Sequence, residues 1–301
     1  YVFAVFFITY YHGKLWRRKE TEEGNQAVFT LLLSSLGTLA LYVTFRAEIV
    51  IYWNQLFDDS MQVSQLESPD RHYGDRNLMH FRLLWTTIFT LFFAGAASLV
   101  NAWWFAGRTR AMVLMVFGFL GIIFFLFQGL MSLGALRSAW IGATPGDMFP
   151  VSDMFIGIRY VGWAALLFLL WAMRFAYRRL SVNTNMGYVL EAITHLSFLV
   201  MGSNEIVHWM DVAGSGNGEK MGVSVYWGLY ALLLIVMGIR TGKQYQRIAA
   251  LVIFGAALLK LFFYDLSHLD TISKTITLVV LGILLLLVSF LYYKFRNKLS
   301  E

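Results

Sequence analysis

Apolar residues follow one another along this chain in long runs, and short polar segments separate the runs. Most runs reach the roughly 20 residues that a helix needs to cross about 30 Å of hydrocarbon. The runs predict transmembrane helices near residues 1–11, 27–47, 82–105, 111–135, 155–173, 186–208, 222–239, 246–264 and 275–293. The first run is short because the sequence begins inside it at Tyr1, with no methionine or basic segment before it. We therefore expect the chain to be a fragment of a longer multi-span protein.

This pattern predicts an all-α fold: a polytopic transmembrane helical bundle of about nine spans, the first of them truncated. A soluble protein with so many apolar helices would have too little polar surface to face water. An outer-membrane barrel needs short alternating segments, and the sequence shows none. We expect residues 1–301 to form a single transmembrane domain, in which residues 56–79 are the longest extracytoplasmic loop.

Composition agrees with a membrane location. Hydrophobic residues make up 58% of the chain and charged residues 14%, whereas about a quarter of a typical soluble domain is charged. The chain contains no cysteine, which excludes disulfides, thiolate metal ligands and cysteine nucleophiles. The net charge of +6 does not indicate a nucleic-acid partner, because most of the 24 Lys and Arg residues lie in one set of loops.

The loops between the predicted helices alternate between a basic and an acidic balance. The basic set consists of Lys14, Arg17, Arg18, Lys19, Arg108, Arg110, Arg174, Arg178, Arg179, Arg240, Lys243, Arg247, Lys294, Arg296 and Lys298. The acidic set consists of Asp58, Asp59, Glu67, Asp70, Asp75, Asp147, Asp153, Asp211, Glu219, Asp265 and Asp270. Because basic loops stay on the cytoplasmic side of a membrane, we expect the basic set, and with it the C-terminus, to be cytoplasmic.

Some basic residues do not fit this topology, because they lie at the outer ends of predicted helices. They are Arg46, Arg82, Arg159 and Lys260. Charged residues inside a membrane are costly and often functional. Guanidinium groups bind phosphate or carboxylate through paired hydrogen bonds, so this set, with Asp265, predicts an outer-leaflet pocket for an anionic ligand. Alternatively, the long side chains reach the outer head groups or pair with acids at the same depth.

The helix predicted over residues 186–208 carries two pairs of polar residues. Glu191 and His195 are four residues apart and can bond to each other. Glu205 and His208, three residues apart, can do the same. Three interpretations remain open: the first pair forms a proton path, the second performs acid–base chemistry at the outer face, or both join helices through hydrogen bonds. The second pair has a spacing found in di-metal bundles, but a second such motif is missing, so no metal site is expected.

The last third of the chain, from Ser224 to Phe295, contains several short motifs. They are Tyr226-Trp227 before an apolar helix, Gly238-Ile239-Arg240 at its end, Leu259-Lys260-Leu261-Phe262 with Asp265-Leu266, and Leu281-Gly282 in a helix that ends in Leu291-Tyr292-Tyr293. Together with Ser203-Asn204-Glu205, this segment resembles the C-terminal part of a bacterial family of predicted membrane proteins, domain of unknown function 2339. The resemblance implies a many-span protein of the bacterial inner membrane, usually much longer than this chain. It implies no established activity or cofactor.

Three functions are compatible with these residues. In the first, an envelope protein binds or processes an anionic lipid-linked or glycan substrate, with the outer basic set and Asp265 as binding residues and Glu205 and His208 as acid–base groups. In the second, a proton-coupled transporter or flippase uses Glu191 and His195 as its coupling site. In the third, the chain is a structural or assembly subunit without chemistry. Membrane lipids and additional transmembrane segments or subunits are expected partners, no cofactor is expected, and whether the chain is an enzyme stays open.

Overall fold

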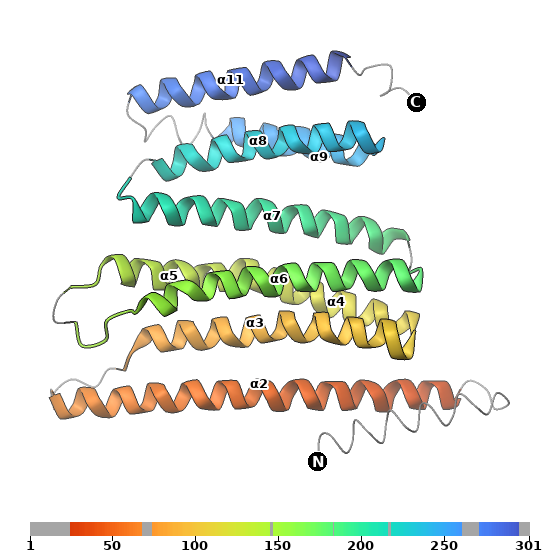
Figure 1. The fold of residues 1–301 in the computed structure, drawn as a ribbon, viewed down its shortest axis with the longest axis vertical. Coiled ribbons are helices and arrows are strands. Elements are labelled where there is room, and N and C mark those ends of the chain that lie inside the picture. Colours follow the sequence, from red (N-terminus) through yellow and green to blue (C-terminus); the bar gives the residue numbers. More distant parts are fainter. Residues whose placement is uncertain are drawn as a thin grey trace. The chain divides into compact units, whose positions relative to one another are not determined.

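The computed structural model describes residues 25–67, 74–144, 147–182, 184–215, 218–260 and 271–294, and within these ranges the regular structure is helical (Figure 1). The predicted all-α class is therefore confirmed. By their internal contacts, the helices divide into two compact units, residues 1–194 and residues 195–301.

Helices of both units coincide with apolar runs of the sequence. The first unit contains α2 (Asn25–Glu67), α3 (Arg76–Val100) with the π-helical turn η1 (Asn101–Phe105), α4 (Arg108–Phe124) with η2 (Phe125–Gly129) and α5 (Leu130–Ile141), α6 (Asp153–Leu180), and the first part of α7 (Thr184–Val212). The second unit contains the rest of α7, followed by α8 (Gly218–Thr241), α9 (Gln244–Lys260) and α11 (Thr271–Lys294).

In the described part of the chain, 6 helices are long and apolar enough to cross a membrane. They are Ser34–Ser64, Arg76–Phe105, Arg108–Ile141, Asp153–Leu180, Asn185–Val212 and Met221–Thr241. A shorter apolar stretch, Lys274–Leu287, lies in α11. The predicted first span, residues 1–11, lies outside the described residues. The multi-span helical character is thus confirmed, whereas the count of nine spans and the cytoplasmic C-terminus stay predictions.

Helix α2 is longer than the sequence pattern predicts. The pattern places a span near 27–47 and a loop over 56–79, but α2 continues to Glu67 and α3 begins at Arg76. The helix can continue because the sequence has no proline before Pro69. At 1.5 Å per residue, its 43 residues extend about 65 Å, which is about twice the thickness of the hydrocarbon layer.

Helix α3 is the centre of the first unit, where α2, α4, α5 and α6 pack around it. Leu84 and Leu91 on α3 and Leu169 on α6 are completely buried. A Cβ atom on Gly95 of α3 would overlap with the Phe168 ring of α6, so the glycine permits the close approach of these two helices. Small residues at helix contacts are typical of membrane bundles, where packing stabilises association.

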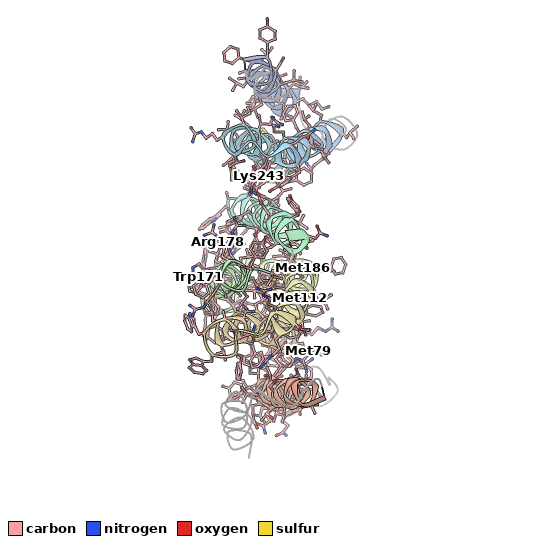
Figure 2. All side chains as sticks on the ribbon, turned by 90° about the vertical axis from the view of Figure 1, so that its right-hand side faces the viewer. Met79, Met112, Trp171, Arg178, Met186 and Lys243 are labelled. Atoms are coloured by element: carbon pink, nitrogen blue, oxygen red, sulfur yellow. The ribbon has the colours of Figure 1, made fainter. Side chains whose placement is uncertain are left out.

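Helix α2 lies beside the other helices of the first unit rather than among them, as the view along the helices shows (Figure 2). Only 6% of its most apolar stretch is buried. Leu36, Leu39 and Val43 are 62%, 56% and 53% exposed. Such a continuous apolar surface is a liability in water, but it matches the acyl chains of a bilayer.

One end of the first unit gathers the last turns of α2 and α5 and the first turns of α3 and α6 (Figure 1). Asp75 caps α3 by accepting a hydrogen bond from the backbone N–H of Asn77 (2.9 Å). The backbone N–H of Asp75 donates to the Ser60 hydroxyl on α2 (2.9 Å). The Trp140 indole at the end of α5 donates to Asp153 at the start of α6 (3.1 Å). These bonds fix the helix ends to one another.

Helix α8 is the centre of the second unit, where it packs against α9 and α11. Ala231 on α8, Phe254 on α9, and Leu281 and Leu284 on α11 form a buried cluster. The side chain of Leu284 occupies the space that a Cβ atom on Gly228 would need. As in the first unit, a glycine therefore allows a close helix contact.

Candidate functional site

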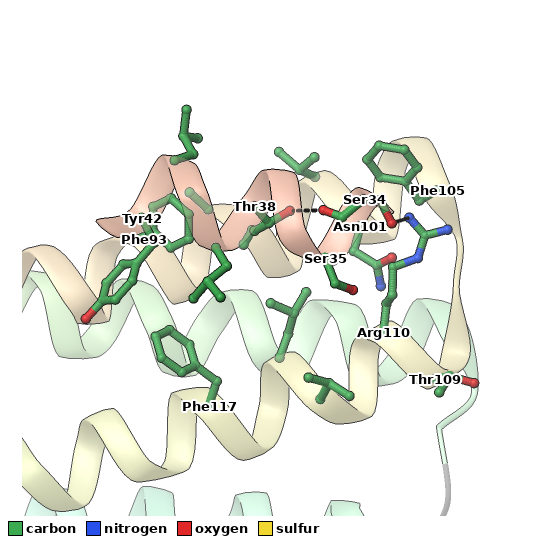
Figure 3. Close-up of a pocket in the computed structure, with 17 residues that line it drawn as sticks. Ser34, Ser35, Thr38, Tyr42, Phe93, Asn101, Phe105, Thr109, Arg110 and Phe117 are labelled. Atoms are coloured by element: carbon green, nitrogen blue, oxygen red, sulfur yellow. Dashed lines mark hydrogen bonds between the residues drawn. The ribbon is translucent and has the colours of Figure 1, made fainter. Parts of the chain in front are cut away.

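A cavity of about 410 Å³ lies in the first unit between α2, the end of α3 with η1, and the start of α4 (Figure 3). Aromatic rings close one end of it: the centre of the Tyr42 ring is 5.3 Å from that of Phe93 and 5.5 Å from that of Phe117. Leu39 and Val113 are among the apolar residues of its walls. The volume and the apolar lining are typical of small-molecule sites.

The other end of this cavity is polar. Nη1 of Arg110 donates to the Ser34 hydroxyl on α2 (3.4 Å), and the guanidinium carbon lies 4.7 Å from the centre of the Phe105 ring. The side chain of Asn101 lies at the same end (Figure 3). A guanidinium that stacks on an aromatic face can still direct its N–H edge toward a hydrogen-bond acceptor. The cavity therefore combines apolar walls with a cationic group at one end.

The π-helical turn η1 builds the polar end. It stops at Ala106, which has a left-handed backbone (φ 50°) and whose N–H bonds to the carbonyl of Asn101 (2.7 Å). The side-chain amide of Asn101 donates to the carbonyl of Gly107 (3.0 Å). Asn101 therefore stabilises the turn through its backbone carbonyl and through its side chain. Gly107 is the N-cap of α4 and offers no side-chain cap. Such π-helical turns occur frequently at functional sites.

The sequence pattern does not single out this cavity. Arg110 belongs to the basic loop charges that set orientation, and Asn101 is an isolated polar residue at the end of an apolar run. The only local signal is Asn101, Gly107 and Arg110 within ten residues between two apolar helices. Ser34 is 76 residues from Arg110 in sequence, so its part in the cavity depends on how α2 packs.

Members of the predicted outer basic set in the first unit differ in their burial. Arg46 is exposed on α2. Arg82 on α3 is half-buried, and its guanidinium donates to the side chain of Asn54 on α2. Arg159 on α6 is only 4% exposed, with its guanidinium carbon 6.0 Å from the centre of the Tyr160 ring. Arg159 is therefore enclosed by protein, whereas Arg46 faces the surroundings.

The predicted acid–base pair lies on α7 in the second unit. Glu205 accepts a hydrogen bond from the indole of Trp209, one turn later on the same helix (2.9 Å). His208 is 3% exposed, and its ring centre lies 5.3 Å from that of Trp209. Within the described ranges, no group of three His, Asp or Glu side chains is placed to hold a metal ion. Acid–base chemistry by this pair stays a prediction.

Lys260 is also in the second unit, as the last residue of α9, and its Nζ donates to the Ser224 hydroxyl on α8 (3.0 Å). Asp265, the other predicted binding residue here, lies outside the described residues. Two segments that carry the sequence resemblance are in contact, because the Trp227 indole of α8 donates to the Ser203 hydroxyl of α7 (2.8 Å). These residues thus contribute to helix packing in this unit.

Glu191 and His195 lie on α7, and both are half-buried. The hydroxyl of Tyr230 on α8 is 3.0 Å from Nδ1 of His195 and donates to the backbone carbonyl of the same residue (3.1 Å). The Tyr226 hydroxyl donates in the same way to the carbonyl of Phe198 (2.8 Å). These bonds join α7 to α8 and favour the helix-joining interpretation of His195, while the proton path stays a prediction.

Comparison with protein families matches residues 1–295 to a family of predicted membrane proteins, domain of unknown function 2339. No curated protein and no solved structure matches the chain. The resemblance of the last third is therefore confirmed and extends over nearly the whole sequence. With this match and its apolar helices, the chain belongs to the family of predicted membrane proteins called domain of unknown function 2339.

Proposed function

We propose that this chain binds a membrane lipid with an anionic head group in the cavity between α2, η1 and α4. The observation that carries the proposal is the guanidinium of Arg110 at one end of a cavity with apolar walls. A phospholipid has the same division into a charged head and apolar chains. The phosphate would contact Arg110, and part of an acyl chain would lie toward Tyr42 and Phe117.

Selectivity at such a site comes from the head group. An acyl chain in a bilayer is already surrounded by groups as apolar as Tyr42 or Phe117, so its transfer into the cavity gains little hydrophobic free energy. A guanidinium–phosphate contact is charge-assisted, and it is strengthened where water is excluded. Arg110 is half-buried and held against Phe105, so it loses little further side-chain entropy when a ligand binds.

The polar end of the cavity is expected in the cytoplasmic leaflet. Arg108 and Arg110 at the start of α4 and Arg178 and Arg179 at the end of α6 belong to the basic loop set. Basic loops favour the cytoplasmic side, and the anionic lipids of that leaflet attract them. On the same charge pattern we infer a nine-span protein of the bacterial inner membrane with a cytoplasmic C-terminus.

The test is a lipid-binding measurement on the full chain in phosphatidylcholine nanodiscs that contain a graded fraction of an anionic phospholipid. We expect Arg110→Gln to weaken binding by about 10-fold, the effect of losing one charge-assisted hydrogen bond. Arg108→Gln is the matched control, because Arg108 is exposed, lies two residues away and does not line the cavity. Equal weakening by both variants would mean that only net charge matters, and it would overturn the proposal.

A second candidate function is binding or processing of an anionic lipid-linked or glycan substrate at the outer leaflet. It is favoured by the burial of Arg159, because a buried guanidinium is rare and costly. We propose the following binding and acid–base residues for it: Arg46, Arg82, Arg159, Lys260 and Asp265, with Glu205 and His208. An Arg159→Gln variant that folds and binds a lipid-linked sugar phosphate as tightly as the unaltered chain would exclude this function.

The remaining candidates are a proton-coupled transporter or flippase and an assembly subunit without chemistry. The bonds between Tyr230 and His195 favour the assembly subunit, since they give His195 a role in helix packing. Transport through Glu191 and His195 requires that Glu191→Gln abolish proton-dependent uptake in vesicles. Full uptake by that variant would exclude the coupling site.

A further inference from the structure

The cavity lies between two helices that run in the same direction. At its polar end Ser34 of α2 contacts Arg110 of α4, and at its aromatic end the rings of Tyr42 and Phe117 are 5.5 Å apart. Residue numbers rise from the polar to the aromatic end on both helices, so each helix forms one side of the cavity (Figure 3). Helix α3 forms its base, because both α2 and α4 pack against α3.

Two side chains on the walls of the cavity also reach the surface of the protein. Leu39 of α2 and Val113 of α4 line the cavity, and they are 56% and 62% exposed. Such exposure requires contact with the surroundings as well as with the cavity. Along their helices, both residues lie between the contacts that close the two ends. The cavity is therefore open to the surroundings between α2 and α4, on the side away from α3.

This opening lies at the depth of acyl chains if Arg110 is at the level of the head groups. Val113 follows Arg110 by three residues, and Leu39 follows Ser34 by five. At 1.5 Å per residue, the two side chains are therefore about 4.5 and 7.5 Å farther into the bilayer than the polar end. Both are apolar, so the hydrocarbon meets the cavity without a polar barrier at the opening.

The cavity is too small to enclose a whole phospholipid. Its volume of about 410 Å³ suits a drug-sized molecule, and a phospholipid with two acyl chains is considerably larger. Part of such a lipid has to stay outside, and the opening at Leu39 and Val113 lets its chains extend into the bilayer. Entry from water would instead require the acyl chains to leave the hydrocarbon, which is unfavourable.

Resting on the proposed lipid site, we propose that the lipid enters the cavity sideways from the hydrocarbon, through the opening that Leu39 and Val113 border. The head group stays at the depth of Arg110 during this movement, so no charge has to cross the hydrocarbon. The acyl chains pass between α2 and α4 and remain partly in the bilayer. The site thus takes its ligand from the membrane leaflet, and not as a soluble phosphate from the aqueous phase.

The test closes the opening with a chemical bridge. The chain has no cysteine of its own, so the double variant Leu39→Cys/Val113→Cys can be cross-linked selectively with a bifunctional maleimide. The full chain is placed in phosphatidylcholine nanodiscs, phosphatidylglycerol is supplied from donor vesicles, and native mass spectrometry measures the phosphatidylglycerol retained. Cross-linking before the lipid is supplied is expected to abolish its retention. Cross-linking after loading is expected to trap the lipid and slow its release.

A second pair of variants needs no bridge, and it decides if the double variant does not fold or does not cross-link. Val113→Cys that carries a bulky maleimide narrows the opening, so it is expected to take up phosphatidylglycerol more slowly than the unaltered chain. Ile123→Cys with the same maleimide is the matched control, because Ile123 is 54% exposed on the same helix and does not line the cavity. Equal uptake rates for the two labelled chains would overturn sideways entry.

The remaining outcomes separate the entry route from the site. Uptake by the bridged chain at the rate of the same variant without the bridge overturns the entry route and leaves the Arg110 site intact. No retention of phosphatidylglycerol by the unaltered chain above the phosphatidylcholine background overturns the proposed lipid site itself. Glycerol 3-phosphate carries the phosphate without acyl chains, and it is expected not to displace phosphatidylglycerol. Displacement would assign the site to a soluble anion and overturn entry from the membrane.

Discussion

The hydroxyl of Tyr230 on α8 lies 3.0 Å from Nδ1 of His195 on α7 and donates to the backbone carbonyl of that histidine (3.1 Å). The Tyr230 hydroxyl therefore contacts both the ring and the backbone of His195, and which atom donates to the other in the ring contact depends on the tautomer of the histidine. A residue that the sequence marks as a candidate proton relay is thus part of the contact between two helices.

We expect Tyr230→Phe to lower the free energy of unfolding by about 1 kcal/mol, because a polar contact between membrane helices contributes about that much. Thermal unfolding in detergent measures the change. Tyr293→Phe is the control, since Tyr293 is 77% exposed on α11 in the same unit. If both substitutions lower stability equally, the contact between Tyr230 and His195 contributes nothing specific.

Gly202 on α7 leaves room for the Tyr226 side chain of α8. A Cβ atom on Gly202 would overlap with the Tyr226 hydroxyl, which donates to the carbonyl of Phe198 (2.8 Å). We expect Gly202→Ala to lower the free energy of unfolding by about 1–3 kcal/mol, the range for an overpacked contact. In detergent the loss would appear as a lower unfolding temperature.

The control for this substitution is Gly255→Ala on α9, where a Cβ atom meets nothing within 4 Å. Alanine has the higher helix propensity, so this variant is expected to be as stable as the unaltered chain, or more stable by up to about 1 kcal/mol. A Gly202→Ala protein as stable as Gly255→Ala would contradict the close contact with Tyr226.

The helices follow from the sequence because of the solvent. In hydrocarbon every backbone polar group needs an internal partner, so a long apolar run has to be helical. The run near 222–239 accordingly coincides with α8, Gly218–Thr241. The end of α2 is polar, so this requirement does not apply to it. Its residues up to Glu67 are compatible with either a loop or a helix, and in the structure they are helical.

The cavity could not be predicted for a different reason. The charge pattern of the loops explains Arg110 as an orientation signal, so the sequence does not mark it as a binding residue. It does mark the outer basic set, which contains Arg82 and Arg159. What distinguishes Arg110 is its contact with Ser34 and Phe105, and what distinguishes Asn101 is its burial. The contact with Ser34 depends on how α2 packs, and no local pattern in this chain encodes that packing.

Asp75, the N-cap of α3, is expected to make stability depend on pH. Burial raises the pKa of Asp75, outweighing the hydrogen bonds from Asn77 that lower it. A carboxyl group whose pKa is higher in the folded than in the unfolded state stabilises the fold below the unfolded pKa, and this contribution is lost as pH rises through the folded pKa. Asp75→Asn keeps the cap acceptor and removes the ionisable group. The stability of this variant should therefore not fall as pH rises through the folded pKa of Asp75.

Thermal unfolding between pH 4 and pH 7 tests this, with the unaltered chain losing stability relative to Asp75→Asn as the pH rises. Asp75→Ala separates the cap from the charge, because it loses the bond to the N–H of Asn77 and should be less stable than Asp75→Asn by about 1 kcal/mol. Parallel pH curves for the unaltered chain and Asp75→Asn would contradict the raised pKa of Asp75.

The loop charges predict which residues face the cytoplasm, and the absence of cysteine permits a direct test. Asp59→Cys and Asp147→Cys, at exposed positions, are expected to react with a membrane-impermeant maleimide added to intact spheroplasts. Arg108→Cys and Arg178→Cys, also at exposed positions, should react only after lysis, because basic loops remain cytoplasmic. Ser300→Cys tests the C-terminus and should behave like Arg178→Cys. Labelling of both groups from one side would contradict the alternation, and reversed labelling would move the polar end of the cavity to the outer leaflet.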